Sequence, residues 1–303
     1  MNTRNLLNSR APIQRPPAHN IAMFLFGALL CAAGVAVTYW AFVRTTTGQL
    51  ADETAWREAE VALPAAQLPV LAFLDELPML SVFIAGAVML MVTIRRRRLA
   101  PAVIALSTFA AANITSQLLK RLFLDRPDRG VATLDFNSLP SGHTTLAASA
   151  AAVVFLLASP RWRPAVAAVG GSYAVLAGAA TFVNLWHRPA DVVASFLVVG
   201  AWTLIGGLVM MRTAPDWNYW PPGGRSRGGV QVFAAVCWIP GLLALLMSVG
   251  TYVYAISGTT ILGSSGTLQL YFWSGLGLIV GVGYVLSALA CALFSMQAGD
   301  PAR

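Results

Sequence analysis

The sequence predicts an all-α, polytopic integral membrane protein with about eight transmembrane helices. Of its 303 residues, 57% are hydrophobic and only 11% are charged, which is too little polarity to coat a soluble globule of this size. Long charge-free apolar runs recur along the chain, and about 18 such residues suffice to cross a ~30 Å hydrocarbon core as a helix. The same composition excludes an intrinsically disordered chain.

The expected spans follow the apolar runs in chain order. Six runs each predict one helix, and they are 20–43, 77–94, 99–119, 141–158, 164–186 and 192–211. The final run, 228–299, is too long for one crossing, and its Gly-, Ser- and Thr-rich middle at 257–267 predicts a turn between two spans. The apolar part of the first run is about twice the length of a signal-peptide core, so we expect this helix to be retained.

Basic residues are distributed unevenly between the expected loops. With the N-terminus inside, thirteen of the twenty Arg and Lys residues fall on the cytoplasmic side, and ten of the twelve acidic residues fall on the other side. Cationic loops tend to stay cytoplasmic, so the pattern predicts a multi-pass protein of the cytoplasmic membrane in this orientation. Despite the net charge of +8, the cations lie in short scattered clusters, which argues against a nucleic-acid partner.

The longest expected extramembrane stretch is 44–76, where acidic residues alternate with Ala and Leu. A solvated loop is favoured over a partly helical lid at the membrane interface. The three cysteines lie inside apolar runs and match no disulfide framework or zinc site. No cluster of acidic residues and histidines has metal-ligand spacing, so we expect neither a metal nor another cofactor.

Three short polar segments are expected on the same outer face, because they lie at ends of successive spans. The first runs from Lys120 to Pro127 and contains Arg126. A cluster that snorkels to anchor a helix end is the simpler interpretation. However, the cluster lies on the acidic side, where the charge bias disfavours cations. A Lys point charge and a planar Arg fork are together suited to binding a phosphate.

The other two segments each carry a histidine. Ser141 and Gly142 precede His143 at the start of a predicted helix, where free backbone N–H groups and the helix dipole form an anion site; a plain helix cap is the alternative. Asp191 lies one turn after His187, within reach of its imidazole. A carboxylate on one ring nitrogen leaves the other as a nucleophile, although such a pair is more often only a satisfied hydrogen bond.

In this order and at ends of successive spans, Lys-x5-Arg-Pro, Pro-Ser-Gly-His and His-x3-Asp resemble the three signature motifs of the type 2 phosphatidic acid phosphatase (PAP2) superfamily. Members of this superfamily share a helical core with vanadium haloperoxidases. The resemblance covers residues 99–211, and it implies a PAP2-like catalytic core there. The flanking parts are then 1–98, with a basic tail, two helices and an outer loop, and 212–303, with a cytoplasmic loop and two further helices.

The resemblance also implies a role for each matching residue. His187 would attack phosphorus to give a phosphohistidine, Asp191 would orient it, and His143 would protonate the leaving group. The implied phosphate ligands are Lys120, Arg126, Ser141 and the backbone N–H of Gly142.

The sequence departs from the family pattern at two places. Five residues rather than six separate Lys120 from Arg126, which makes Arg121 an alternative to Lys120. The Ser-Arg pair that normally begins the third motif is replaced by Ala180 and Thr181. Arg188 is a candidate substitute for that arginine.

The sequence therefore predicts a membrane phosphatase that hydrolyses a lipid phosphate or diphosphate at the outer face of the membrane. Its partners would be this substrate and the surrounding lipids. Two alternatives stay open at this point. One is a lipid phosphotransferase that uses the same site, and the other is a non-catalytic membrane protein that binds anionic lipid.

Overall fold

A computed structural model describes residues 18–97, 99–132, 136–214, 217, 227–257 and 268–297. In these residues the regular structure is helical, as predicted, without a strand. The helices are α1 (Ala18–Val43), α2 (Thr46–Ala62), α3 (Pro64–Arg96), α4 (Ala100–Leu118), η2 (Leu119–Phe123, a π-helical turn), α5 (Gly142–Leu157), α6 (Arg163–Val183), α7 (Pro189–Thr213), α8 (Arg227–Ile256) and α9 (Leu270–Met296).

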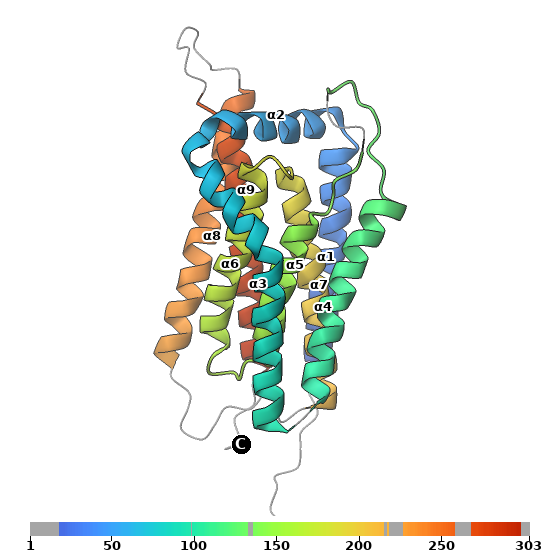
Figure 1. The fold of residues 1–303 in the computed structure, drawn as a ribbon, viewed down its shortest axis with the longest axis vertical. Helices are drawn as coiled ribbons and strands as arrows, with labels where there is room; N and C mark the ends of the chain where they lie inside the picture. Colours follow the sequence, from blue (N-terminus) through green and yellow to red (C-terminus); the bar gives the residue numbers. More distant parts are fainter. Residues whose placement is uncertain are drawn as a thin grey trace, which may run out of the picture.

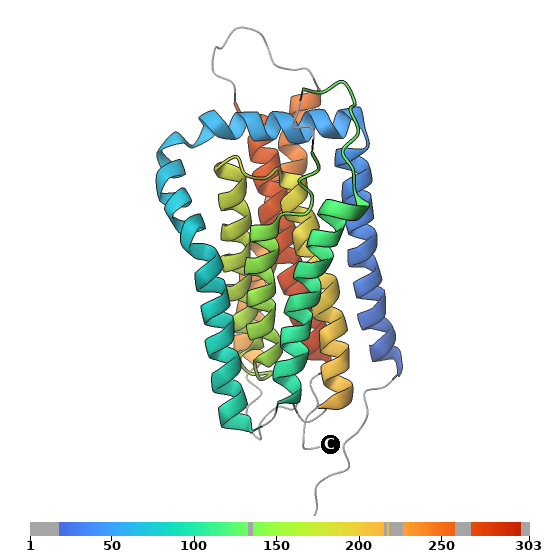
Figure 2. The ribbon, with the colours of Figure 1, turned by 45° about the vertical axis from the view of Figure 1, so that its right-hand side comes forward.

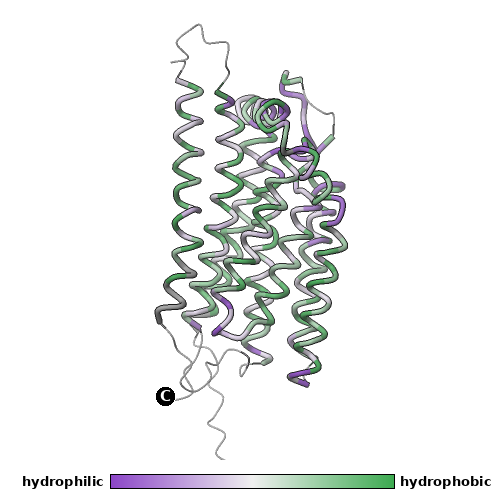
Figure 3. The backbone as a smooth tube through the Cα atoms, turned by 60° about the vertical axis from the view of Figure 1, so that its left-hand side comes forward, coloured by the Kyte–Doolittle hydropathy of each residue, from purple (hydrophilic) through white to green (hydrophobic). Residues whose placement is uncertain are grey.

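The long helices run side by side along one axis (Figure 1). Hydrophobic residues fill their middle parts, and hydrophilic residues gather at the two ends (Figure 3). Among the described residues, six helices are long and apolar enough to cross a membrane, and α3 makes a seventh if its two halves, bent by 44°, count as one span. The remaining expected span, 141–158, corresponds to α5, a shorter apolar helix of 16 residues. Helices suit this environment because their backbone groups are hydrogen-bonded within the segment.

Three sequence expectations fall on residues that the structure does not describe. They concern the basic tail at 1–17, most of the cytoplasmic loop that follows 214, and nearly all of the turn expected at 257–267.

The stretch expected to be a solvated loop contains a helix instead. Residues 46–62 form α2, which crosses one end of the bundle at a steep angle to the other helices (Figures 1 and 2). Thr45 caps its N-terminus, because its Oγ1 accepts a hydrogen bond from the N–H of Gly48 at 3.0 Å. The polar residues Gln49, Asp52 and Glu53 of this helix are buried. The face of α2 that meets the bundle is therefore partly polar. We call this end of the bundle the α2 end.

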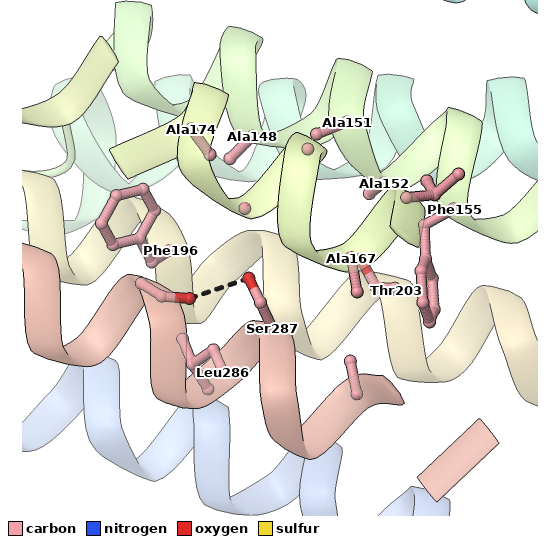
Figure 4. Close-up of a pocket in the computed structure, with 15 residues that line it drawn as sticks. Ala148, Ala151, Ala152, Phe155, Ala167, Ala174, Phe196, Thr203, Leu286 and Ser287 are labelled. Carbon is pink, nitrogen blue, oxygen red and sulfur yellow. Dashed lines mark hydrogen bonds between the residues drawn. The ribbon is translucent and has the colours of Figure 1, made fainter. Parts of the chain in front are cut away.

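Small side chains allow the central helices to pack closely. Ala, Gly and Ser residues of α5, α6 and α9 line a cavity of about 100 Å³ that also touches α7 (Figure 4). Ser287 on its wall donates a hydrogen bond to the carbonyl oxygen of Gly283 at 2.9 Å, so the hydroxyl is satisfied within α9. None of the candidate site residues lines this cavity.

Glycines bring the neighbouring helices up to the start of α7. A Cβ atom added to Gly178 on α6 would lie 2.5 Å from Cγ1 of Val192, and one added to Gly275 on α9 would lie 2.5 Å from Cγ of Pro189. Real Cβ contacts are not this short, so only glycine permits this approach. The first turn of α7 is therefore clamped between α6 and α9.

Candidate active site

The three polar segments predicted to converge do lie together at the α2 end (Figure 2). The first follows α4 and η2, the second leads into α5, and the third connects α6 to α7. His143 interacts electrostatically with His187 and with Lys120. Its ring also packs against Trp186, with a centroid separation of 5.0 Å. The structure thus brings the three segments together at one end of the bundle, as their places at the ends of successive spans predicted.

The His187–Asp191 contact has the predicted geometry. Pro189 begins α7, and Nδ1 of His187 lies 3.1 Å from Oδ2 of Asp191. The same carboxylate oxygen accepts the backbone N–H of Arg188 at 3.1 Å. Asp191 is fully buried and His187 is 8% exposed. With Nδ1 engaged by the carboxylate, Nε2 is the ring nitrogen left for chemistry.

Ser141 is the N-cap of α5, which corresponds to the simpler of its two interpretations. Its Oγ accepts a hydrogen bond from the N–H of Thr144 at 3.3 Å, and its own N–H donates to the carbonyl of Asp191 at 3.0 Å. Ser195 donates to that carbonyl as well, at 2.8 Å. These bonds join the start of α5 to the first turn of α7. The cap still leaves the hydroxyl proton of Ser141 and the N–H of Gly142 to be donated to an anion.

The structure separates Lys120 from its neighbour Arg121. Lys120 is half-buried and interacts electrostatically with Asp191, whereas Arg121 is exposed. Of the two, Lys120 is therefore the one placed at the site.

Arg126 is the most unusual group in the site. Its Nε, Nη1 and Nη2 atoms are all buried, and none has a hydrogen-bond partner among the described residues. Burial lowers the pKa of this guanidinium, and Arg188 lowers it further, whereas Asp52, Asp191 and Glu53 oppose the shift. A buried guanidinium with all its donors unused is costly unless an acceptor is supplied.

Arg188 is not free in the same way. It is 2% exposed, and its guanidinium donates to Glu53 of α2 through Nε at 2.9 Å and to Oγ of Ser138 through Nη1 at 3.1 Å. In this arrangement Arg188 is not an open replacement for the arginine missing at Thr181. Thr181 itself is buried and donates its hydroxyl to the carbonyl of Gly178 at 2.8 Å.

Sequence reasoning missed the two acidic residues that α2 contributes. Asp52 accepts the N–H of Ala190 at 3.1 Å, while Glu53 binds Arg188. Burial and the nearby Asp191 raise the pKa of Asp52 to about 7. The sequence does show two adjacent carboxylates in a helix-forming, Ala-rich stretch. Nothing in that stretch indicates which end of which other helix α2 packs against.

These observations define a helical membrane protein that carries two histidines, three buried carboxylates and a buried guanidinium without an acceptor among the described residues at one end of its bundle. Residues 79–219 match the family model described as the PAP2 superfamily. The resemblance to the PAP2 superfamily that the three motifs predicted is therefore confirmed for this segment. Comparison with curated proteins gave no match, and comparison with solved structures gave none either.

The family and the spanning helices make this a multi-pass membrane protein of the phosphatase type. The matched segment begins in α3 and ends after α7, so it includes the three motifs and excludes α1, α2, α8 and α9. The acidic residues that α2 brings to the site therefore lie outside the family match.

Proposed function

We propose that this protein hydrolyses a lipid phosphate or diphosphate through a phosphohistidine on His187, at the outer face of the cytoplasmic membrane. The observation that carries the proposal is the buried guanidinium of Arg126, which interacts electrostatically with Asp191 of the His187–Asp191 pair. Its N–H donors have no acceptor among the described residues. A phosphate oxygen supplies the missing acceptor, and an Arg fork suits the geometry of phosphate.

The reaction proceeds in two displacements. Nε2 of His187 attacks phosphorus and the bond to the leaving oxygen breaks, while His143 gives that oxygen a proton. Asp191 stabilises the imidazolium formed on His187, and Lys120 and Arg126 bind the phosphoryl oxygens. Water then attacks the phosphohistidine, His143 takes a proton from that water, and phosphate leaves with His187 restored.

The surroundings of the site favour an amphiphilic substrate. Leu122 and Phe123, next to the cationic pair of η2, are 72% and 70% exposed. In a membrane these side chains face lipid at the level where headgroups lie. A substrate with a hydrocarbon chain can therefore reach Lys120 sideways from the bilayer.

The decisive assay is phosphate release by the purified protein in detergent from phosphatidic acid, phosphatidylglycerophosphate and a polyprenyl diphosphate. We expect release from at least one lipid, loss of release in His187→Ala, and normal release in His19→Ala, which changes the histidine near the start of α1. Release by His187→Ala at the wild-type rate would contradict the proposal. Transfer of phosphate to an added alcohol without release of free phosphate would favour a phosphotransferase.

The proposed orientation is tested by labelling single cysteines in intact cells with an impermeant reagent. The native cysteines 31, 237 and 291 are buried. They are replaced first, so that the reagent can label only the introduced cysteine. Leu99, immediately before α4, and Asp128, in the segment after η2, are both exposed. We expect Asp128→Cys to be labelled and Leu99→Cys to be protected. The reverse pattern would place the site on the cytoplasmic side.

A further inference from the structure

The buried ion pair between Glu53 and Arg188 has an uneven geometry. Nε and Nη2 of Arg188 lie 2.9 and 2.8 Å from the same oxygen, Oε2 of Glu53. A fork-to-fork pair would instead use both carboxylate oxygens. The second oxygen, Oε1, lies 3.6 Å from Nε of Arg57. Glu53 thus presents a single oxygen to Arg188, as one oxygen of a phosphate group would.

This pair lies directly beside the proposed nucleophile. Arg188 follows His187 in the chain, and its backbone N–H shares Oδ2 of Asp191 with the imidazole. Its Nη1 donates to Ser138, on the segment that leads into α5. The guanidinium is therefore held between the segment that carries His187 and the segment that leads into α5.

Glu53 is not needed to hold α2 on the bundle, because other residues of the helix do so. Nε2 of Gln49 donates to the carbonyl oxygens of Val43 and Pro127, at 2.7 and 2.8 Å. Nε1 of Trp56 donates to the carbonyl of Leu185 at 2.9 Å. A carboxylate oxygen of Glu58 accepts the N–H of Phe272 at 2.9 Å. A further buried charge adds little to such anchoring, since its desolvation offsets the attraction.

The two arginines of the site differ in what they require. Arg126 has no acceptor among the described residues, whereas Arg188 already has one in Glu53. A phosphate that enters the site satisfies Arg126 immediately. It gains the Nε and Nη2 donors of Arg188 by replacing Oε2 of Glu53. The exchange leaves no buried cation without a counter-charge, because one anion replaces another. Arg57, whose side chain is 57% exposed, remains as a cation for the displaced carboxylate.

We propose that Glu53 competes with the phosphate group of substrate and product for Arg188, and so sets the affinity of the site for phosphate. This inference rests on the proposed function and deepens it. Glu53 is a positioning residue that acts through Arg188. Competition of this kind weakens the binding of the product phosphate and thereby favours its release.

The test is the inhibition constant of inorganic phosphate, measured with nitrophenyl phosphate as substrate. Glu53→Gln keeps an acceptor for Arg188 but removes the competing charge, so the inhibition constant should fall on the order of tenfold. The matched control is Glu60→Gln, which makes the same chemical change at an exposed position two turns further along α2. We expect no change in that control.

Arg188→Gln provides the complementary measurement. It should raise the inhibition constant of phosphate, and combining it with Glu53→Gln should abolish the tightening. An unchanged or raised constant in a folded Glu53→Gln protein would overturn the proposal. Should Glu53→Gln fail to fold, an unchanged constant in Arg188→Gln would overturn it in the same way.

Phosphate binding is also measured without turnover, as the rise in Tm that phosphate causes. This readout separates the two proposals. A wild-type protein that binds phosphate but hydrolyses no phosphate ester would contradict the proposed function. Tighter binding by Glu53→Gln in that protein would still support competition for Arg188.

Discussion

Oδ2 of Asp191 is shared by Nδ1 of His187 and the backbone N–H of Arg188, each at 3.1 Å. One carboxylate oxygen therefore fixes both the imidazole and the chain that carries it. Asp191→Asn should lower kcat by roughly 10²- to 10⁴-fold, because an amide favours the wrong imidazole tautomer. Protein abundance and Tm should stay near wild type. Asp128→Asn, an exposed change in the loop after α4, is the control. A kcat in Asp191→Asn equal to that of the control would remove Asp191 from the mechanism.

His143 and His187 should respond differently to the leaving group. His143→Ala removes a proton donor, whose contribution is roughly 10²- to 10⁴-fold, and this loss should shrink for nitrophenyl phosphate, whose leaving phenolate needs little protonation. His187→Ala removes the nucleophile and should be inactive with every substrate. Turnover of a lipid phosphate and of nitrophenyl phosphate by both variants measures the difference. Equal losses on both substrates would contradict this division of roles.

Arg126 should contribute to activity at a cost to stability. Arg126→Met removes buried donors that lack acceptors, so it should stabilise the protein by about 1–3 kcal/mol while lowering kcat/KM by about 10²-fold or more. Thermal unfolding and turnover of the same sample test both expectations. Arg129→Met changes an exposed arginine three residues away and should do neither. A loss of both stability and activity in Arg126→Met would indicate a structural role instead.

Asp52 should make stability depend on pH. Its pKa is raised to about 7 in the folded protein by burial and by Asp191, against the ordinary value of 3.8. Between these two values the unfolded chain is ionised while folded Asp52 keeps its proton, so its contribution falls as pH rises and is lowest above about 7. Asp52→Asn removes this dependence. It should stabilise the protein more at pH 8 than at pH 5, by at most about 3 kcal/mol, because about two pH units at roughly 1.4 kcal/mol each separate pH 5 from the folded pKa. Tm values of both proteins at the two pH values would show it, and an equal difference at both would contradict it.

Gly275 should matter to the site although it lies in α9, outside the family match. Gly275→Ala places a methyl group against Pro189, the first residue of α7, and should lower both Tm and kcat. Gly250→Ala is the matched control, because a Cβ there meets nothing within 4 Å. It should keep activity and gain slightly in helix stability. Wild-type behaviour of Gly275→Ala would show that α9 does not fix the position of α7.

The sequence by itself determined the all-helical membrane fold, because 18-residue apolar runs have few other stable forms in a bilayer. It also determined which segments meet, since their places at successive span ends put them on one side. The contact between His187 and Asp191 was predictable from helical spacing alone. Ser141 as a cap was among the stated alternatives, because local backbone bonding depends on neighbouring residues.

Tertiary structure alone decided what surrounds the arginines. The contacts of Arg188 and Ala190 with α2 join residues more than 130 positions apart, and no local periodicity encodes such pairs. We predicted a loop at 44–76 because polar residues are usually exposed to solvent. In the structure, however, Gln49, Asp52 and Glu53 are buried against the bundle. Whether a buried arginine has a hydrogen-bond acceptor depends on which side chains and carbonyl groups the fold places around it. For this reason only the fold distinguishes the occupied Arg188 from the unpartnered Arg126.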